Sequence, residues 1–162
     1  YQQGKQHYLW GTPYKLDIIT GVKRASVKLT DSQSITLRIP DTYTHNQKEK
    51  LLDSLYRKEL KQAIPQMLEN WQQVVGKEVN DWGVKKMRTR WGTCNIQAKR
   101  IWLSLELAKK PVKCLEYVMV HELVHLHERH HNQRFYELMT LFMPEWREYE
   151  ALLKQGNQPV EL

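Results

Sequence analysis

His121, Glu122 and His125 follow one another in the order His-Glu-x-x-His, where x is any residue. In an α-helix, residues four positions apart lie about 40° apart around the axis and about 6 Å apart along it. Both imidazoles can therefore bind one metal ion, and Glu122 lies beside it. The apolar residues around this pattern have helical spacing, so buried polar side chains here require a reason. The pattern is typical of zinc hydrolases.

A catalytic zinc site takes three protein ligands and leaves one position open for water. Candidates for the third ligand lie downstream: His127, Glu128, His130, His131, Glu137, Glu145 and Glu148. On a continued helix His131 would lie about 9 Å beyond His125 and out of reach. A ligand at position 131 requires the helix to break, and Arg129-His130 before Asn132 offers such a break. Spacing alone leaves the third ligand open.

Five segments have to position these residues. They are strands over about 8–39, a long helical segment over about 46–75, a hairpin over about 82–107, an active-site helix over about 111–129 and C-terminal helices over about 132–155. The first is predicted as a three-stranded meander over 15–19, 26–29 and 34–39. Pro65 should kink or split the long helix, and Asn132 suits a helix N-cap.

These segments predict an α+β fold in one domain over residues 1–162, with a small antiparallel or mixed sheet packed on helices. The 162 residues are 41% hydrophobic and 27% charged, which excludes a disordered or fibrous chain. No apolar stretch approaches the roughly 18 residues that a membrane span needs. The formal net charge of +7 favours a polyanionic partner or an acidic substrate, although the positive residues are scattered.

The chain has only two cysteines, Cys94 and Cys114. Two are too few for the disulfide framework of a small secreted domain, so we expect buried thiols and no catalytic role for either. The expected location is the cytoplasm. Because the chain begins with Tyr1 rather than methionine, the sequence leaves open whether a leader segment has been removed.

Four segments carry a resemblance to a known family. They are Thr89-Arg90-Trp91-Gly92-Thr93-Cys94, Ile101-Trp102-Leu103-Ser104-Leu105, the run from Tyr117 to His125, and His131-Asn132-Gln133-Arg134-Phe135. In order and spacing they resemble the YgjP-like metal-dependent hydrolases, most closely over 82–153. The resemblance implies a zincin-like metallopeptidase domain, akin to the SprT-like proteins, whose active site lies on the HExxH helix.

The same resemblance implies a ligand set. His121, His125 and His131 would hold one Zn²⁺ per chain, and Glu122 would be the general base. The spacing is also similar to that of metzincins, but Glu128 stands where metzincins have glycine, which argues against a metzincin.

The sequence also suggests roles for residues outside this ligand set. Donors for a developing oxyanion would come from Arg90, Tyr117, His127 or His130, with Arg90 favoured because its motif belongs to the family pattern. The strand over 100–107 is a candidate edge for binding an extended peptide. Residues expected to pack under the site are Phe135, Leu138, Leu141 and Phe142.

Three functions fit these observations. The leading one is a zinc peptidase that cleaves a peptide or protein substrate. The second directs the same activated water at a nucleotide phosphoanhydride, which a basic chain would attract. The third is a basic module associated with DNA, with a SprT-like protease activity or none. A membrane partner is not expected.

Overall fold

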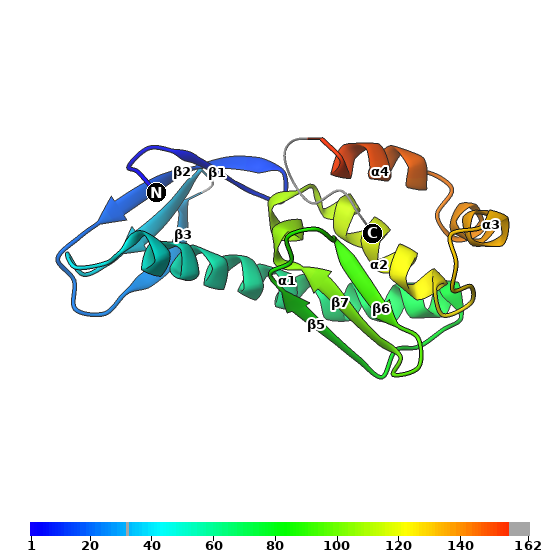
Figure 1. Ribbon diagram of the computed structural model, residues 1–162. Helices are drawn as coiled ribbons and strands as arrows, with labels where there is room; N and C mark the ends of the chain where they lie inside the picture. Colours follow the sequence, from blue (N-terminus) through cyan, green and yellow to red (C-terminus); the bar gives the residue numbers. More distant parts are fainter. Residues whose placement is uncertain (32, 156–162) are drawn as a thin grey trace.

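The computed structural model describes residues 1–31 and 33–155. Two small sheets lie toward opposite ends of one long helix, α1 (His45–Val75), and three shorter helices gather at the end that holds the second sheet (Figure 1). This confirms the predicted α+β class with mixed sheets. No helix among the described residues is both long and apolar enough to cross a membrane.

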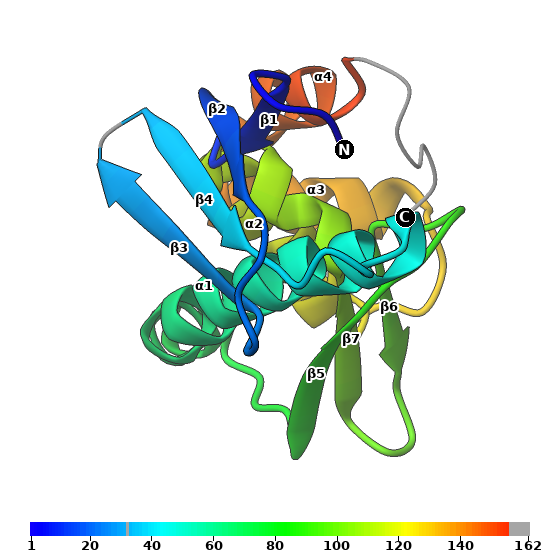
Figure 2. The same cartoon turned by 90° about the vertical axis from the view of Figure 1, so that its left-hand side faces the viewer.

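The N-terminal sheet has four strands: β1 (Gln6–Leu9), β2 (Thr12–Ile19), β3 (Ser26–Asp31) and β4 (Ser34–Arg38). Their order is β1-β2-β4-β3, with β2 parallel to β4 (Figure 2). The predicted meander is therefore wrong, because β4 lies between β2 and β3. Alternating hydrophobicity shows which residues form strands, but it does not say which strands pair. Ile35 and Leu37 of the inner strand β4 are fully buried.

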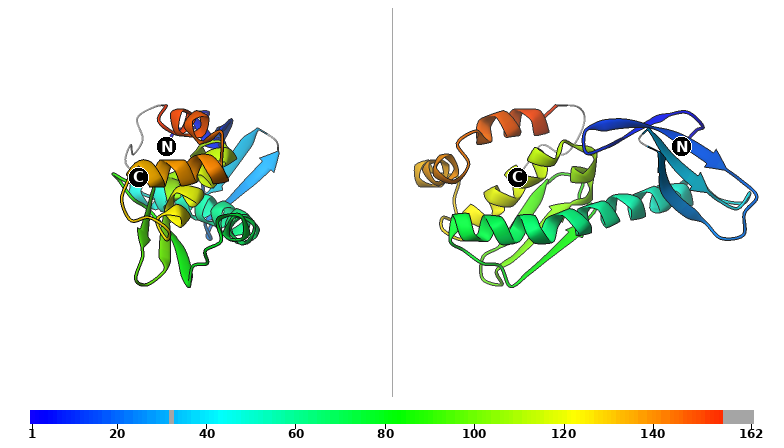
Figure 3. Two further views of the ribbon diagram at one scale, coloured as in Figure 1. Left: turned by 90° about the vertical axis from the view of Figure 1, so that its right-hand side faces the viewer. Right: turned by 180° about the vertical axis from the view of Figure 1, so that it is seen from behind.

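Helix α1 has sequence signals at both ends. Thr44 and Gln47 form a capping box at its start, in which each side chain accepts a hydrogen bond from the other residue's backbone N–H. Gly76 ends the helix in the left-handed region, with φ of 76°. The 31 residues make a rod about 46 Å long. Figure 3 shows this rod passing both sheets.

Pro65 lies inside α1, and the helix continues through it. The sequence predicted that Pro65 would kink or split this segment, and of these two outcomes the split is wrong. Pro65 is on the exposed side, whereas Ile64 and Leu68 are buried in the core. Burial of such side chains stabilises by about 1.5–3 kcal/mol each, which offsets the backbone hydrogen bond that proline removes.

The second sheet contains β5 (Asp81–Lys85), β6 (Gly92–Asn95) and β7 (Arg100–Ser104), in the order β5-β7-β6. The hairpin lies at β6 and β7, while β5 pairs with β7 in parallel. The predicted hairpin is thus correct in its second strand and wrong in its first. Because β7 is the central strand, its backbone is paired on both sides, and the expected substrate edge at 100–107 is also wrong. The edges of this sheet are β5 and β6, and β6 is the edge strand whose residues line the cleft described below.

The chain then forms the 3₁₀ helix η1 (Leu105–Lys109) and the helices α2 (Val112–Val124), α3 (Gln133–Phe142) and α4 (Trp146–Leu153). The side chain of Asn132 accepts a hydrogen bond from the backbone N–H of Phe135, which confirms the predicted N-cap. Helix α2 has 13 residues and ends at Val124, so it is shorter than predicted. This early end shapes the site described below.

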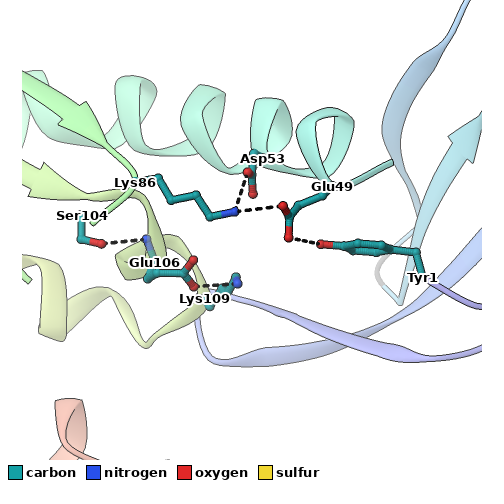
Figure 4. A network of polar contacts seen from close by, with 7 residues as sticks. All are labelled: Tyr1, Glu49, Asp53, Lys86, Ser104, Glu106 and Lys109. Atoms are coloured by element: carbon teal, nitrogen blue, oxygen red, sulfur yellow. Dashed lines mark hydrogen bonds and ion pairs between the residues drawn. The ribbon is translucent and has the colours of Figure 1, made fainter. Parts of the chain in front are cut away.

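A polar network joins the N-terminus, α1 and the segment after β5 (Figure 4). Lys86 Nζ lies 3.0 Å from Asp53 Oδ2 and 3.6 Å from Glu49 Oε2. The Tyr1 hydroxyl donates to Glu49 Oε1 at 3.4 Å. Partly exposed pairs of this kind each contribute about 1 kcal/mol or less, so they fix relative position more than they stabilise the fold.

Candidate metal centre

Helix α2 supplies the first half of the site. It is buried along almost its whole length, because β6 and β7 cover one side of it and α1 and α4 cover others. His121 and Glu122 lie near its C-terminal end and are only 4% and 2% exposed. His125 is the residue that directly follows the helix. A buried helix therefore carries three polar side chains at one end.

A tight turn directly after α2 brings the chain back toward it. The backbone N–H of Leu126 donates to the carbonyl of Leu123 at 3.0 Å, and that of His127 donates to Val124 at 2.9 Å. These are i to i−3 bonds, which tighten a helix end and turn the chain away from the axis. The break thus comes at Val124, before the predicted Arg129-His130.

The turn places three imidazoles together. Nε2 of His131 lies 3.0 Å from Nε2 of His121 and 3.0 Å from Nε2 of His125. Nitrogen ligands at about 2.0–2.1 Å from a tetrahedral zinc ion are about 3.3–3.4 Å apart. Two of the three separations therefore lie within a few tenths of an ångström of this spacing, and all three donor atoms lie within 4.8 Å of one another. The structure brings these three residues together as one group that could hold a metal.

The hydrogen bonding of His125 leaves Nε2, the ring nitrogen that faces the cluster, free to bind a metal. Its Nδ1 lies 3.2 Å from the carbonyl oxygen of Glu128. Because a carbonyl oxygen only accepts, Nδ1 carries the proton and Nε2 presents a lone pair to the centre of the cluster. A backbone acceptor on the second ring nitrogen is the usual way in which a ligating histidine is oriented.

The electrostatic surroundings also keep the rings neutral. Burial, reinforced by the neighbouring His125 and His131, lowers the pKa of His121 to about 3. Burial likewise lowers the pKa values of His125 and His131 below that of a free histidine. Neutral imidazole is the form that binds metal, so no proton competes at neutral pH.

Phe135 of α3 packs against all three rings. Its ring centroid lies 4.8 Å from that of His121, 4.7 Å from that of His125 and 5.0 Å from that of His131. The side chain is fully buried, as expected for packing under the site. The same expectation is wrong for Leu141, which is 69% exposed, because α3 is amphipathic and turns this residue outward.

Glu122 is a buried carboxyl group beside the cluster. Its Oε2 has no hydrogen-bond partner among the described residues. Burial raises the pKa of Glu122 to about 8, and the positive charge of Arg90 opposes that shift. Because this pKa lies near physiological pH, the carboxyl group can exchange a proton under those conditions.

Glu122, His125 and His131 line a cleft of about 710 Å³. Arg90 lines the same cleft, and so do residues of β6. Tyr117 does not: it is 1% exposed, and its hydroxyl donates to Glu150 Oε2 at 3.2 Å. This placement argues against Tyr117 as an oxyanion donor.

The remaining histidines considered from sequence lie outside the cluster. The His127 ring donates from Nε2 to the carbonyl of Val75 at 2.7 Å, which ties the turn to the end of α1. His130 is exposed and does not line the cleft. Glu128 accepts a hydrogen bond from Asn132 Nδ2 at 3.1 Å, and therefore braces the turn where metzincins have glycine.

Sequence reasoning missed Gly92. A Cβ at this position would lie 2.8 Å from Cγ1 of Val118 and 3.2 Å from Cγ of Glu122. Strand β6 therefore packs directly on the part of α2 that holds the general-base candidate. The available signal was a glycine inside a strand, which often marks a close backbone approach.

The comparisons agree with this architecture. The sequence model of the YgjP-like metallopeptidase domain matches residues 1–156. Among solved structures, the metallopeptidase zymogen abylysin of Pyrococcus abyssi is similar, with 17% identity and a TM-score of 0.56, over 61% of this chain and 99% of that one. No curated protein matches the chain.

At 17% identity the solved structure shows that this chain shares the fold of that metallopeptidase zymogen. The family match is the broader result, because it spans the N-terminal sheet, the HExxH helix and the turn that carries His131. At the family level it supports a metal-dependent peptidase. The chain belongs to the YgjP-like family of metallopeptidase domains.

Proposed function

We propose that this domain is a zinc-dependent peptidase in which His121, His125 and His131 hold the ion and Glu122 is the general base. The observation that carries the proposal is the convergence of three neutral Nε2 atoms beside a buried, unpartnered carboxyl oxygen. Structural zinc sites are usually closed by four ligands, often cysteines. Three histidines with an adjacent carboxylate favour catalysis over a structural role.

When bound, zinc supplies Lewis-acid chemistry, acidifying a water molecule and polarising the scissile carbonyl. With the ion in place, Glu122 Oε2, which has no competing partner among the described residues, would accept the proton of the attacking water. The same carboxyl group then delivers the proton to the leaving amine. Burial raises the pKa of this carboxyl group, and the charge of a bound zinc ion would oppose that shift and favour the ionised form that accepts a proton.

Arg90 is the candidate to stabilise the developing oxyanion. It lines the cleft, and its charge acts on Glu122, which places its guanidinium within electrostatic reach of the reaction centre. An oriented cation in such a position stabilises charge that appears only in the transition state.

The free edge of β6 favours a peptide substrate. Within the described residues β6 pairs only with β7, and Thr93, Cys94 and Asn95 line the cleft. An extended chain can add to such an edge through backbone hydrogen bonds. Strand addition would bring a scissile bond alongside Glu122. A nucleotide has no peptide backbone and could not pair with the strand edge in this way.

Metal content and turnover test the proposal together. Tag-free wild type should hold about one zinc per chain by inductively coupled plasma mass spectrometry, and Glu122→Gln should hold the same amount. His131→Ala should lose most of the metal, whereas His130→Ala, a neighbouring exposed histidine outside the cluster, should keep it. Cleavage of a peptide library should disappear in Glu122→Gln and His131→Ala only.

Two results would contradict the proposal. Wild type that binds no metal after zinc is supplied would remove the hydrolase assignment. Full activity in Glu122→Gln would leave the metal site standing and overturn the role of the base.

A further inference from the structure

The charged side chains around the cleft are almost all of one sign. Three arginines are among the residues that line it, Arg90, Arg100 and Arg129. Among the described lining residues the sole carboxyl group is that of Glu122, which is itself buried. A substrate entering this cleft therefore meets a positive field. Walls of low dielectric concentrate such a field and raise the local concentration of anions.

The type of cation is also selective. The chain has nine arginines and sixteen lysines, yet every cation lining the cleft is an arginine. A guanidinium presents a planar fork of donors that matches a carboxylate with two parallel hydrogen bonds, whereas an ammonium acts as a point charge. A merely solvated basic surface would be expected to include lysine.

The arginines surround the free strand edge. Arg90 lies two residues before the start of β6, and Arg100 is paired in register with Asn95 at its other end. The four residues of β6 separate these ends by about 10 Å. Arg129 comes from the turn between His125 and His131. A peptide added to β6 would therefore have a guanidinium near each end and one beside the histidine cluster.

Two of the three arginines are free to bind a substrate. Arg100 Nε lies 3.2 Å from Asp81 Oδ2, so part of its donor capacity is used. The side chains of Arg90 and Arg129 form no ion pair or hydrogen bond with any described residue. Arg90 acts on Glu122 at the reaction centre, which leaves Arg129 as the cation most available for a substrate side chain.

We propose that this cleft selects acidic peptides, with Arg129 pairing with an aspartate or glutamate side chain of the substrate and Arg100 adding to the same field. The inference rests on the peptidase function proposed above and names its substrate class. Arg129 is a specificity-determining residue that does not take part in bond cleavage.

The test compares kcat/KM of zinc-loaded enzyme on peptides of one sequence that carry Glu, Gln or Lys near the scissile bond. Wild type should prefer Glu over Gln by about tenfold or more, because a charge-assisted hydrogen bond is worth about that factor. The preference should weaken as salt is raised. Arg129→Gln should abolish most of it, and Arg129→Glu should reverse it toward Lys.

Arg88→Gln is the matched control. Arg88 is exposed, lies two residues from Arg90 and does not line the cleft, so the same loss of charge there should leave the preference intact. Reversal of the preference in Arg129→Glu cannot arise from a general loss of stability, because a partly unfolded enzyme loses activity on all peptides alike.

The possible failures are distinguishable. If wild type cleaves the Glu, Gln and Lys peptides equally well, or Arg88→Gln loses the preference as Arg129→Gln does, the acidic selectivity is overturned while the peptidase function stands. If no peptide is cleaved and nucleoside triphosphates are hydrolysed instead, the proposed peptidase function itself fails, and the arginines serve phosphates.

Discussion

Replacing Gly92 with alanine tests how strand β6 and helix α2 hold the reaction centre. The added methyl carbon would lie 2.8 Å from Val118 Cγ1, and 3.2 Å from both Glu122 Cγ and the Trp102 carbonyl oxygen. Carbon atoms pack best at about 3.5–4.0 Å, so β6 and α2 have to separate by about 0.7 Å. Overpacking of this kind destabilises by about 1–3 kcal/mol.

Both stability and turnover should respond. In a chain of this size the destabilisation lowers Tm by about 2–12 °C. A misplacement of about 1 Å costs about 100-fold in rate, so moving Glu122 relative to β6 by somewhat less should lower kcat/KM by about tenfold or more. Zinc content should stay at the wild-type level, because none of the three atoms nearest to the added carbon belongs to a histidine of the cluster.

The assays are thermal unfolding followed by circular dichroism, metal analysis and cleavage of a peptide that wild type accepts. Gly21→Ala is the control, because Gly21 has a φ of 85° in the loop between β2 and β3, and a Cβ there meets nothing closer than 4.0 Å. A left-handed alanine costs about 1–2 kcal/mol, which matches the stability loss without touching the cleft.

Wild-type Tm and activity in Gly92→Ala would refute the tight packing of β6 on α2. Equal loss of activity in Gly92→Ala and Gly21→Ala would also count against the reasoning, because it would assign the defect to stability rather than to the position of Glu122.

Three further predictions concern other parts of the chain. Tyr117→Phe should lower the free energy of unfolding by about 1–2 kcal/mol through loss of the hydrogen bond to Glu150, and leave kcat/KM unchanged; a 100-fold loss of rate would instead make the hydroxyl catalytic. Pro65→Ala should raise the free energy of unfolding in urea by about 1–3 kcal/mol, since it restores a backbone donor inside α1; a loss of stability would contradict this. Burial, followed by the charge of Glu122, raises the pKa of Cys94 from 9.0 to about 12. Because the thiolate is the reactive form, iodoacetamide should label Cys94 of chelator-treated protein at pH 8 about 1000-fold more slowly than an unperturbed thiol, and labelling at the unperturbed rate would refute the shift.

Local patterns were sufficient to predict much of the fold. The start of α3 at the capping residue Asn132 and the end of the long helix at about residue 75 depend on immediate neighbours, so the sequence alone predicted both helix boundaries. The split expected as one outcome at Pro65 does not occur, because the local cost of proline is outweighed by packing of Ile64 and Leu68 against distant segments. The parallel pairing of β2 with β4 was missed for the same reason, since it joins strands with another strand between them in sequence.

The site residues also differ in whether local sequence patterns could predict them. Helical periodicity placed His121, Glu122 and His125 on one helix, but it could not choose the third member of the cluster. His131 reaches the others because the chain turns at Val124 and the Glu128 carbonyl takes the proton of His125 Nδ1. Neither the turn nor the backbone acceptor can be recognised from residue types. A turn of this kind does not require a particular side chain, and every residue has a carbonyl. The resemblance to a family supplied what spacing could not.

Helix α1 bears on whether this protein can be divided. Its N-terminal end contacts Tyr1 through Glu49, and the carbonyl of Val75 at its C-terminal end accepts the hydrogen bond from His127 in the turn that carries the histidine cluster. The two sheets thus share one uninterrupted rod instead of being joined by a linker. A cut within the rod would expose the apolar side chains that α1 buries against both halves, whereas the loop between Arg38 and His45 lies outside it. Limited proteolysis should therefore cleave in the loops that flank α1 and spare the helix itself.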